Sequence, residues 1–336
     1  MSILPPPDKT VFGGIDVGGT NLRFGLIDSY NNIVYRENQP TVPLLGKQSF
    51  IERLSAGIER LKIQASLLSK DIFSIGMGIP GVVTSEGLIA YSVKFPYLQG
   101  WNPGQFMSAA CGIPVRVSND ANSAAYGELQ FGAGRAFDSF FMFSIGTGVG
   151  GGVILNRKLW TGCCGAAGEF GHTTVEPDGK PCPCGNRGCL EQYVSAGALA
   201  EAALGPRESG EGGHHSSRNG SRLALASVAD AARSGDIRAV EIFSTAGRYL
   251  GIAAASIANL LNVEAIILGG GVTASFDLFI EAMQREMGAR AISPAATNLE
   301  LVKGELGDNA GIMGSAALAA EEAGSPLLVR HYPPGK

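Results

Sequence analysis

The densest group of reactive side chains in the sequence lies between residues 169 and 191. It contains three cysteines within eight residues, Cys182, Cys184 and Cys189, and His172 precedes them. Three thiolates and one imidazole form a complete tetrahedral ligand set for zinc, which is typical of a structural site with no open position. A disulfide would leave one thiol unpaired and would ignore the histidine. We therefore predict one structural zinc ion held by these four side chains.

The other cysteines and histidines give weaker patterns. We expect Cys164 to pack as a buried thiol, and a redox-sensitive vicinal pair with Cys163 is the alternative. His214 and His215 lie in a polar, glycine-rich stretch at 205–222. Adjacent histidines without further ligands are a poor metal site, so we interpret this stretch as a mobile surface insertion.

A glycine turn near the N-terminus could bind phosphate. Residues 16–21 read DVGGTN and connect two short apolar runs. Gly18 and Gly19 would let backbone N–H groups approach a phosphate, and Thr20 and Asn21 would add side-chain donors. Asp16 could hold Mg²⁺ through water. An ordinary glycine hairpin explains the motif equally well when it is taken alone.

Two further glycine runs change that balance. Gly146, Thr147 and Gly148 follow one apolar run, and Gly269–Gly271 follow another. The first run matches GxGxxG, but a strand at 153–155 follows it instead of the helix that a dinucleotide site requires, and no GxxxxGK[ST] loop occurs. Two equivalent turns in two halves would grip a polyphosphate from both sides. They resemble the phosphate loops of the actin-like and sugar-kinase superfold, and residues 269–271 resemble its adenosine-contacting loop.

Asn119 and Asp120 lie between a strand end and a helix start. Such residues often serve only as helix caps. Beside phosphate loops, the favoured interpretation is that Asp120 accepts the proton of an attacking sugar hydroxyl while Asn119 holds neighbouring hydroxyls. Phosphoryl transfer depends mainly on positioning, and a carboxylate base is a recurring component.

Two similar halves must position these residues. Apolar runs predict strands at 11–17, 22–28, 33–35, 72–80 and 115–117 and a helix at 48–68, then strands at 140–145, 152–155 and 265–268 with a helix at 239–261. We predict two related α/β domains with a cleft between them. The first spans 1–120 and is completed by a helix at about 310–325. The second spans 121–309 and carries the knuckle (172–189) and the insertion (205–222).

Composition excludes several classes of function. The 336 residues carry a net charge of −4 without a basic stripe, which disfavours a nucleic-acid partner. The apolar tract at 249–272 is interrupted by Asn259, Asn262 and Glu264, so we interpret it as a buried helix and strand and not as a membrane span. The N-terminus has no signal-peptide pattern. We expect a cytoplasmic protein with no membrane partner.

The motifs in combination identify a family resemblance. GEFGH followed by CxCGxxGCLE, downstream of DVGGT, NDAN and GTGVGGG, resembles the ROK family and most of all its bacterial ATP-dependent glucokinases. The resemblance implies a two-domain actin-like (ribonuclease H-like) fold, ATP with Mg²⁺, transfer to the 6-hydroxyl of glucose, and a homodimer or homotetramer. It further implies a sugar pocket formed by Gly81, Asn119, Asp120, Glu169, His172 and Glu191.

Three alternatives remain open at this point. Kinases for N-acetylmannosamine, fructose or allose share these motifs, and polyphosphate could replace ATP as donor. A sugar-responsive regulator would carry an added N-terminal helix-turn-helix, for which the first strand near residue 11 leaves no room. An actin-like ATPase would share the phosphate loops but would not need the Cys/His knuckle.

Overall fold

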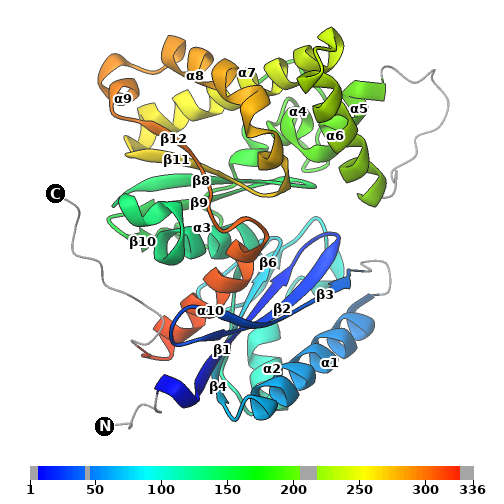
Figure 1. Cartoon of the computed structure of the whole chain (residues 1–336), viewed down its shortest axis with the longest axis vertical. Coiled ribbons are helices and arrows are strands. Elements are labelled where there is room, and N and C mark those ends of the chain that lie inside the picture. Colours follow the sequence, from blue (N-terminus) through cyan, green and yellow to red (C-terminus); the bar gives the residue numbers. More distant parts are fainter. Residues whose placement is uncertain (1–6, 42–45, 205–217, 326–336) are drawn as a thin grey trace. The chain divides into compact units, whose positions relative to one another are not determined.

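The structure, a computed structural model, describes residues 7–41, 46–204 and 218–325 (Figure 1). The chain divides into two compact units. The first comprises Met1–Asp138, Gly152–Gly168 and Gly304–Lys336, and the second comprises Ser139–Gly151 and Glu169–Lys303. The chain thus leaves the first unit after residue 138 and re-enters it twice, at Gly152–Gly168 and at Gly304–Lys336. Each unit is described by itself below.

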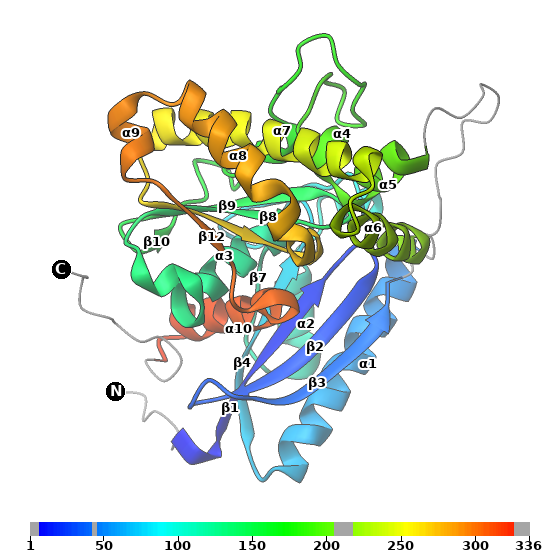
Figure 2. The same cartoon turned by 45° about the horizontal axis from the view of Figure 1, so that its top comes forward.

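The first unit is built on a five-stranded sheet of order β3-β2-β1-β4-β7 (Figure 2). Its strands are β1 (Thr10–Val17), β2 (Asn21–Asp28), β3 (Ile33–Pro40), β4 (Asp71–Ile79) and β7 (Val115–Asn119). Strands β1, β2 and β3 pair antiparallel, whereas β4 pairs parallel with both β1 and β7. The short strands β5 (Val82–Val83) and β6 (Ile89–Tyr91) form a separate ribbon. The parallel pairings place the carboxyl ends of β1, β4 and β7 at one edge of the sheet.

The second sheet repeats the same order with β10-β9-β8-β11-β12. Its strands are β8 (Phe140–Ile145), β9 (Val149–Leu155), β10 (Lys158–Leu159), β11 (Ala265–Gly269) and β12 (Glu300–Lys303). Strand β11 pairs parallel with β8 and β12, and β9 pairs antiparallel with β10. The predicted repetition of one α/β pattern in both halves is therefore confirmed. The turns after β1 and β8 occupy equivalent places, as do the ends of β4 and β11.

Ten α-helices occur in the described part of the chain. The first unit holds α1 (Gly46–Leu67), α2 (Pro103–Cys111), α3 (Asp120–Phe131) and α10 (Ala310–Glu322). The second holds α4 (Glu191–Val194), α5 (Ala196–Leu204), α6 (Arg218–Arg233), α7 (Ile237–Leu261), α8 (Phe276–Arg290) and α9 (Ser293–Thr297). The positions of α1 and α7 agree with the apolar periodicity of the sequence.

One structural expectation is wrong in part. The polar stretch at 205–222 was expected to be a mobile insertion, but α6 already begins at Arg218. Helix growth adds one backbone hydrogen bond for each residue fixed, so a helix nucleated by an apolar segment extends into a polar flank that contains no proline. Residues 205–217, including His214 and His215, lie outside the described residues.

Helix α10 packs closely on the first sheet because two glycines make room for it. A Cβ atom on Gly14 of β1 would overlap the carbonyl oxygen of Ile312, and one on Gly76 of β4 would overlap that of Ser315. Residues 310–320 of the helix are all buried. Backbone-to-backbone contact thus fixes the depth at which the last helix sits on β1 and β4.

We expect Gly76→Ala to destabilise the protein by about 1–3 kcal/mol or more. The backbone fixes the position of the new methyl group, which therefore overlaps the α10 backbone. Gly288→Ala in α8 is the matched control: its Cβ would meet nothing within 4 Å, and it should stabilise the helix by about 0.5–1 kcal/mol. Urea unfolding of both variants measures the difference. Equal midpoints for the two would contradict this account of the α10 contact.

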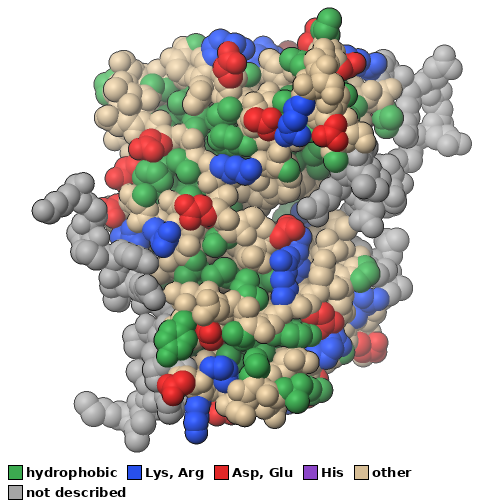
Figure 3. Space-filling view, viewed as in Figure 1, with side chains coloured by type: hydrophobic (Ala, Val, Ile, Leu, Met, Phe, Trp, Pro, Cys, Tyr) green, Lys and Arg blue, Asp and Glu red, His purple; other side chains and the backbone are tan. Residues whose placement is uncertain are grey.

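Within the described residues, none of the helices has the length and hydropathy to cross a bilayer. The face shown in Figure 3 carries basic and acidic side chains interspersed with each other.

Candidate active site

The first phosphate-loop candidate is the turn between β1 and β2. The Gly18 amide donates to the Asn21 carbonyl oxygen (2.8 Å), which closes the turn, and the Thr20 carbonyl oxygen accepts from the Thr41 amide (2.7 Å). The Thr20 hydroxyl oxygen is buried and has no hydrogen-bond partner among the described residues. A buried hydroxyl without a partner is costly, so this one would gain from a hydrogen bond to a further group.

Asp16, predicted to hold Mg²⁺, is the second-last residue of β1 and lies beside this turn. Its Oδ2 accepts a charged hydrogen bond from Nη1 of Arg23 (2.7 Å), and Nη2 of Arg23 reaches Oδ1 of Asp308 (3.3 Å). Burial raises the pKa of Asp16, and the Arg23 charge opposes that rise. Sequence reasoning missed Arg23 and Asp308. The hairpin register, which pairs Asp16 with Arg23, could have indicated Arg23, but nothing local points to Asp308.

Asn119 and Asp120 stand where β7 passes into α3. Asn119 is the helix cap, since its Oδ1 accepts from the Asn122 amide (2.9 Å), while its Nδ2 donates to the Gly81 carbonyl oxygen (3.0 Å). Gly81 has φ 130°, and a Cβ there would overlap the Tyr91 carbonyl oxygen, so only glycine suits that backbone. The cap function therefore belongs to Asn119, which leaves the Asp120 carboxylate free of it.

The surroundings of Asp120 leave most of its carboxylate unengaged. Oδ1 accepts from the Ala121 amide (3.0 Å), and in the described part of the chain no side chain donates a hydrogen bond to it. Burial raises the pKa of Asp120 above its usual range, with the Lys94 charge and the Ala121 amide acting in the opposite direction. The Asp120 charge in turn raises the pKa of Asp16. A desolvated carboxylate with a raised pKa is suited to accept a proton.

The raised pKa of Asp120 gives a stability prediction. Folding favours the protonated form of the Asp120 carboxyl. Its contribution to the free energy of folding is therefore fully present below the ordinary pKa of about 4, and it is lost as pH rises through the raised pKa of the folded state. Asp120→Asn removes this cost, and the ligand-free variant should melt above wild type at pH 7. The difference should disappear as pH falls towards 4. Thermal melts of both proteins across this range test it, and a difference independent of pH would contradict it.

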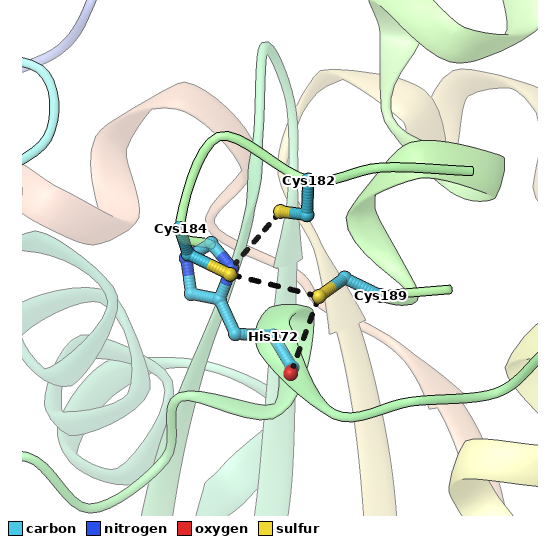
Figure 4. Close-up of side chains that lie close together, drawn as sticks. All are labelled: His172, Cys182, Cys184 and Cys189. Carbon is cyan, nitrogen blue, oxygen red and sulfur yellow. Dashed lines mark hydrogen bonds between the residues drawn. The ribbon is translucent and has the colours of Figure 1, made fainter. Parts of the chain in front are cut away.

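The Cys/His knuckle of the second unit brings its four side chains together (Figure 4). The candidate ligand atoms of His172, Cys182, Cys184 and Cys189 all lie within 4.8 Å of one another. Cys182 Sγ lies 3.7 Å from His172 Nδ1, and Cys184 Sγ lies 3.7 Å from Cys189 Sγ. Tetrahedral zinc with bonds of about 2.3 Å to sulfur and 2.0–2.1 Å to nitrogen requires separations of about 3.6–3.8 Å. The four residues therefore form a group that could hold a metal ion, with Nδ1 as the histidine ligand atom.

The three thiols of the knuckle differ in pKa. Removal from water raises the pKa of Cys182 and raises that of Cys189 to about 12, whereas the pKa of Cys184 is lowered by the Asn186 amide and by the neighbouring thiols against the effect of burial. A metal ion must replace these protons to bind thiolates. Metal binding at this site should therefore be weaker at acidic pH.

The sheet holds the segment that contains Glu169 and His172. Phe170, between them, packs edge-on against Phe141 and Phe143 of β8, with ring centroids 5.0 and 6.4 Å away. On the other side of the knuckle, the Leu190 amide donates to the Thr173 carbonyl oxygen (3.0 Å), directly before Glu191 at the start of α4. The knuckle thus ties the backbone beside His172 to the backbone beside Glu191.

The second phosphate-loop candidate is bound to the same segment. Glu191 Oε2 accepts from the Val149 amide (2.8 Å), and the Gly146 carbonyl oxygen accepts from the Ala196 amide (2.9 Å). A Cβ on Gly146 would meet nothing within 4 Å, so the turn formed by Gly146, Thr147 and Gly148 is open to a ligand. The carboxylate of Glu191 keeps one oxygen for another partner.

The third glycine run turns sharply after β11. Gly270 has φ 85°, and a Cβ there would overlap the Ile145 carbonyl oxygen at the end of β8, whereas a Cβ on Gly271 would meet nothing within 4 Å. The run thus brings its backbone against the start of the second phosphate loop. A Cβ on Gly269 would also overlap the Met142 side chain, so the fold requires glycine at 269 and 270, and Gly271 is the open position of the turn.

The expectation that Cys164 is buried is wrong. Both Cys163 and Cys164 are exposed, because Gly162 and Gly165, each with positive φ, turn the loop outward on either side of them. Packing of this loop is instead provided by Gly165, where a Cβ would overlap the Val83 carbonyl oxygen.

Comparison with known proteins decides the family. The ROK family model matches residues 12–322. The chain belongs to the ROK family. A glucokinase from Halalkalibacterium halodurans is 32% identical over 328 residues, covering 93% of this chain and 96% of that protein. A crystal structure of a ROK family glucokinase from Streptomyces griseus, in complex with glucose and AMPPNP, aligns with a TM-score of 0.77 at 29% identity, covering 93% and 99% of the two chains.

ROK membership confirms the predicted fold, which is the two-domain actin-like, ribonuclease H-like α/β fold of the ROK sugar kinases. It does not by itself separate enzymes from regulators. A xylose repressor from Bacillus subtilis is 30% identical over 314 residues, covering 92% of this chain but 76% of the repressor. The side chains described above must therefore carry the functional argument.

Proposed function

We propose that this ROK protein is an ATP-dependent hexose kinase, and specifically a glucokinase that transfers the γ-phosphate of ATP to the 6-hydroxyl of glucose. The observation that carries the proposal is the state of Asp120: a half-buried carboxylate with a raised pKa at the start of α3, relieved of the capping function by Asn119. A helix cap alone would need no such carboxylate, whereas a hydroxyl nucleophile does.

In the proposed reaction, Asp120 accepts the proton of the 6-hydroxyl as that oxygen attacks the γ-phosphorus. A new O–P bond forms, the bond between the γ-phosphorus and the β,γ-bridging oxygen breaks, and ADP leaves. The raised pKa of Asp120 makes its carboxylate a stronger proton acceptor than an exposed one. The Asn119 amide, held by Gly81 and by the start of α3, and the carboxylates of Glu169 and Glu191 would hydrogen-bond the remaining hydroxyls with His172.

The phosphate-binding role of the glycine turns is part of this proposal. Asp16, Gly18, Gly19, Thr20 and Asn21 in the first unit, and Gly146, Thr147, Gly148 and Gly269–Gly271 in the second, would bind ATP. Mg²⁺, held through water by Asp16, would neutralise charge on the phosphates when bound. The unpartnered Thr20 hydroxyl supports this assignment, because a phosphate oxygen would satisfy it.

We further propose that the knuckle binds zinc. The fit of the 3.7 Å ligand separations to a tetrahedron supports zinc, and four protein ligands leave no position for water, so the ion is structural. With Nδ1 of His172 turned to the metal, its other ring nitrogen is free to hydrogen-bond a sugar hydroxyl. The metal would thus orient a sugar-binding side chain.

A sugar-responsive regulator is the second candidate, favoured by the match to the xylose repressor. A coupled assay with glucose, N-acetylmannosamine, fructose and allose, each with ATP or polyphosphate as donor, separates the possibilities. We expect turnover with glucose and ATP. Sugar binding without turnover for any pair would reject the kinase, and preference for another sugar or donor would reject the glucokinase assignment.

A further inference from the structure

The feature that the proposed reaction does not yet use is the guanidinium of Arg23. It lies beside the first phosphate-loop candidate, since a Cβ on Gly18 would be 3.9 Å from its Nη1. Its side chain is 15% exposed. Arginine remains charged throughout the physiological range. A partly buried cation directly beside this turn attracts an anion to it.

Arg23 is not saturated by its partners. A guanidinium has five N–H donors in a planar fork. One hydrogen bond goes to Asp16 and one to Asp308, and the buried Nε has no hydrogen-bond partner among the described residues. A buried N–H without a partner costs free energy, so Arg23 retains donors that the described residues leave unsatisfied.

The two carboxylates that hold Arg23 differ. The bond to Asp16 is short, at 2.7 Å, and the Asp16 side chain is 12% exposed, whereas the bond to Asp308 measures 3.3 Å and the Asp308 side chain is 44% exposed. A longer ion pair with an exposed partner contributes little free energy. Asp16 therefore anchors the guanidinium, and Asp308 is the partner that a stronger anion can displace.

The position of Asp308 is fixed by a buried carboxylate in α3. Glu128 is 1% exposed, and its two oxygens accept from the backbone amides of Leu306 (2.9 Å) and Glu305 (3.1 Å). Asp308 follows within the next turn, Gly307–Asn309. The approach of Asp308 to Arg23 is thus set by the fold and is not the chance position of a free loop.

We propose, resting on the kinase function proposed above, that Arg23 is a nucleotide-phosphate-binding residue whose guanidinium exchanges Asp308 for a phosphate oxygen of ATP. In the absence of nucleotide, one positive and two negative charges meet beside the loop, and the excess negative charge opposes phosphate binding. Exchange removes that opposition and gives the unused donors of Arg23 an acceptor. Asp308 thus competes with ATP for the guanidinium, and Arg23 attracts the phosphates of ATP.

The two residues should have opposite effects on nucleotide binding. Loss of one charge-assisted contact in Arg23→Gln should weaken binding of the Mg²⁺ complex of the ATP analogue AMPPNP roughly tenfold or more. Binding of adenosine, which has no phosphate, should stay within about twofold. Arg23→Lys should recover part of the loss, because it keeps the charge but not the fork. Asp308→Asn should tighten analogue binding by about threefold, the size expected of a weak exposed ion pair.

Isothermal titration calorimetry on the full chain tests this, with Arg60→Gln as the matched control. Arg60 forms a 2.7 Å ion pair with Glu37 in the same unit, so its loss reproduces the change of charge away from the phosphate loop. Equal binding by Arg23→Gln and Arg60→Gln would overturn the proposal. Weaker binding of the analogue by Asp308→Asn would also overturn it, because the ion pair between Arg23 and Asp308 would then only stabilise the β1–β2 hairpin.

The proposed function and the role of Arg23 fail in different ways. A wild type that binds the analogue with these variant effects but phosphorylates none of the sugars would reject the kinase and keep the Arg23 site. If the protein is an active kinase and Arg23→Gln binds the analogue as wild type does, the Arg23 site is rejected and the kinase function is kept. A wild type that binds no nucleotide would reject both. Urea unfolding of each variant, and the unchanged fold expected of Asp308→Asn, separate binding effects from misfolding.

Discussion

Asp120→Asn is expected to lower kcat by roughly 10²–10⁴-fold and to leave the dissociation constant for glucose nearly unchanged. General-base catalysis contributes a factor of that size. The amide retains the shape of the carboxylate, and its oxygen can still accept from the Ala121 amide, but it cannot take a proton from the attacking hydroxyl. Steady-state kinetics and calorimetric titration of glucose measure the two effects.

Asp28→Asn serves as the control for this prediction. Asp28 is a buried carboxylate of the first unit, and its Oδ1 accepts from the amides of Tyr30 and Asn32, both at 2.9 Å. Its replacement should reduce stability through the turn after β2 without affecting the chemical step. Unchanged turnover in Asp120→Asn would reject the base assignment, as would an equal loss of turnover in Asp28→Asn.

The second large effect is expected from the knuckle. Cys184→Ser should lower the bound zinc from one ion per chain towards zero, lower the melting temperature, and weaken glucose binding roughly tenfold or more. At such sites the free energy of zinc binding adds directly to the free energy of folding. Loss of a partner that orients a ligand-binding side chain typically lowers affinity or activity 10–100-fold. Metal analysis, thermal melts and sugar titration measure the three effects. Chelation of wild type should reproduce them.

Cys163→Ser is the matched control, because Cys163 is an exposed thiol outside the knuckle. It should retain zinc, stability and sugar affinity. A folded, metal-free protein that binds glucose like wild type would contradict the proposed connection between the metal and the sugar pocket. Retained zinc in Cys184→Ser would contradict the ligand set itself.

The local patterns of the sequence predicted much of the fold. Alternation of apolar runs with glycine turns indicated the strands, because a buried parallel strand must be apolar along its whole length. The helices α1 and α7 followed from their apolar periodicity. The grouping of the knuckle side chains was also predictable, since the three cysteines and His172 lie within 18 residues of chain.

Where local signals were weak, the predictions were incomplete. The start of α6 at Arg218 depends on cooperative helix growth from its apolar part, which a polar composition does not reveal. The exposure of Cys164 depends on the outward turn at Gly162 and Gly165. A thiol is as compatible with a surface loop as with a core, so its residue type could not decide.

Two features were decided by tertiary structure alone. Asp308 reaches Arg23 across 285 positions of sequence, because Glu128 holds the intervening turn and α10 returns to β1 and β4. The division of roles between Asn119 as cap and Asp120 as desolvated carboxylate depends on Gly81 and on the start of α3. The sequence alone determined which residue types could do chemistry and which short segments hold them. Long-range pairing and burial decided how each carboxylate is partnered, because desolvation and ion pairing depend on neighbours that the folded chain brings from distant positions.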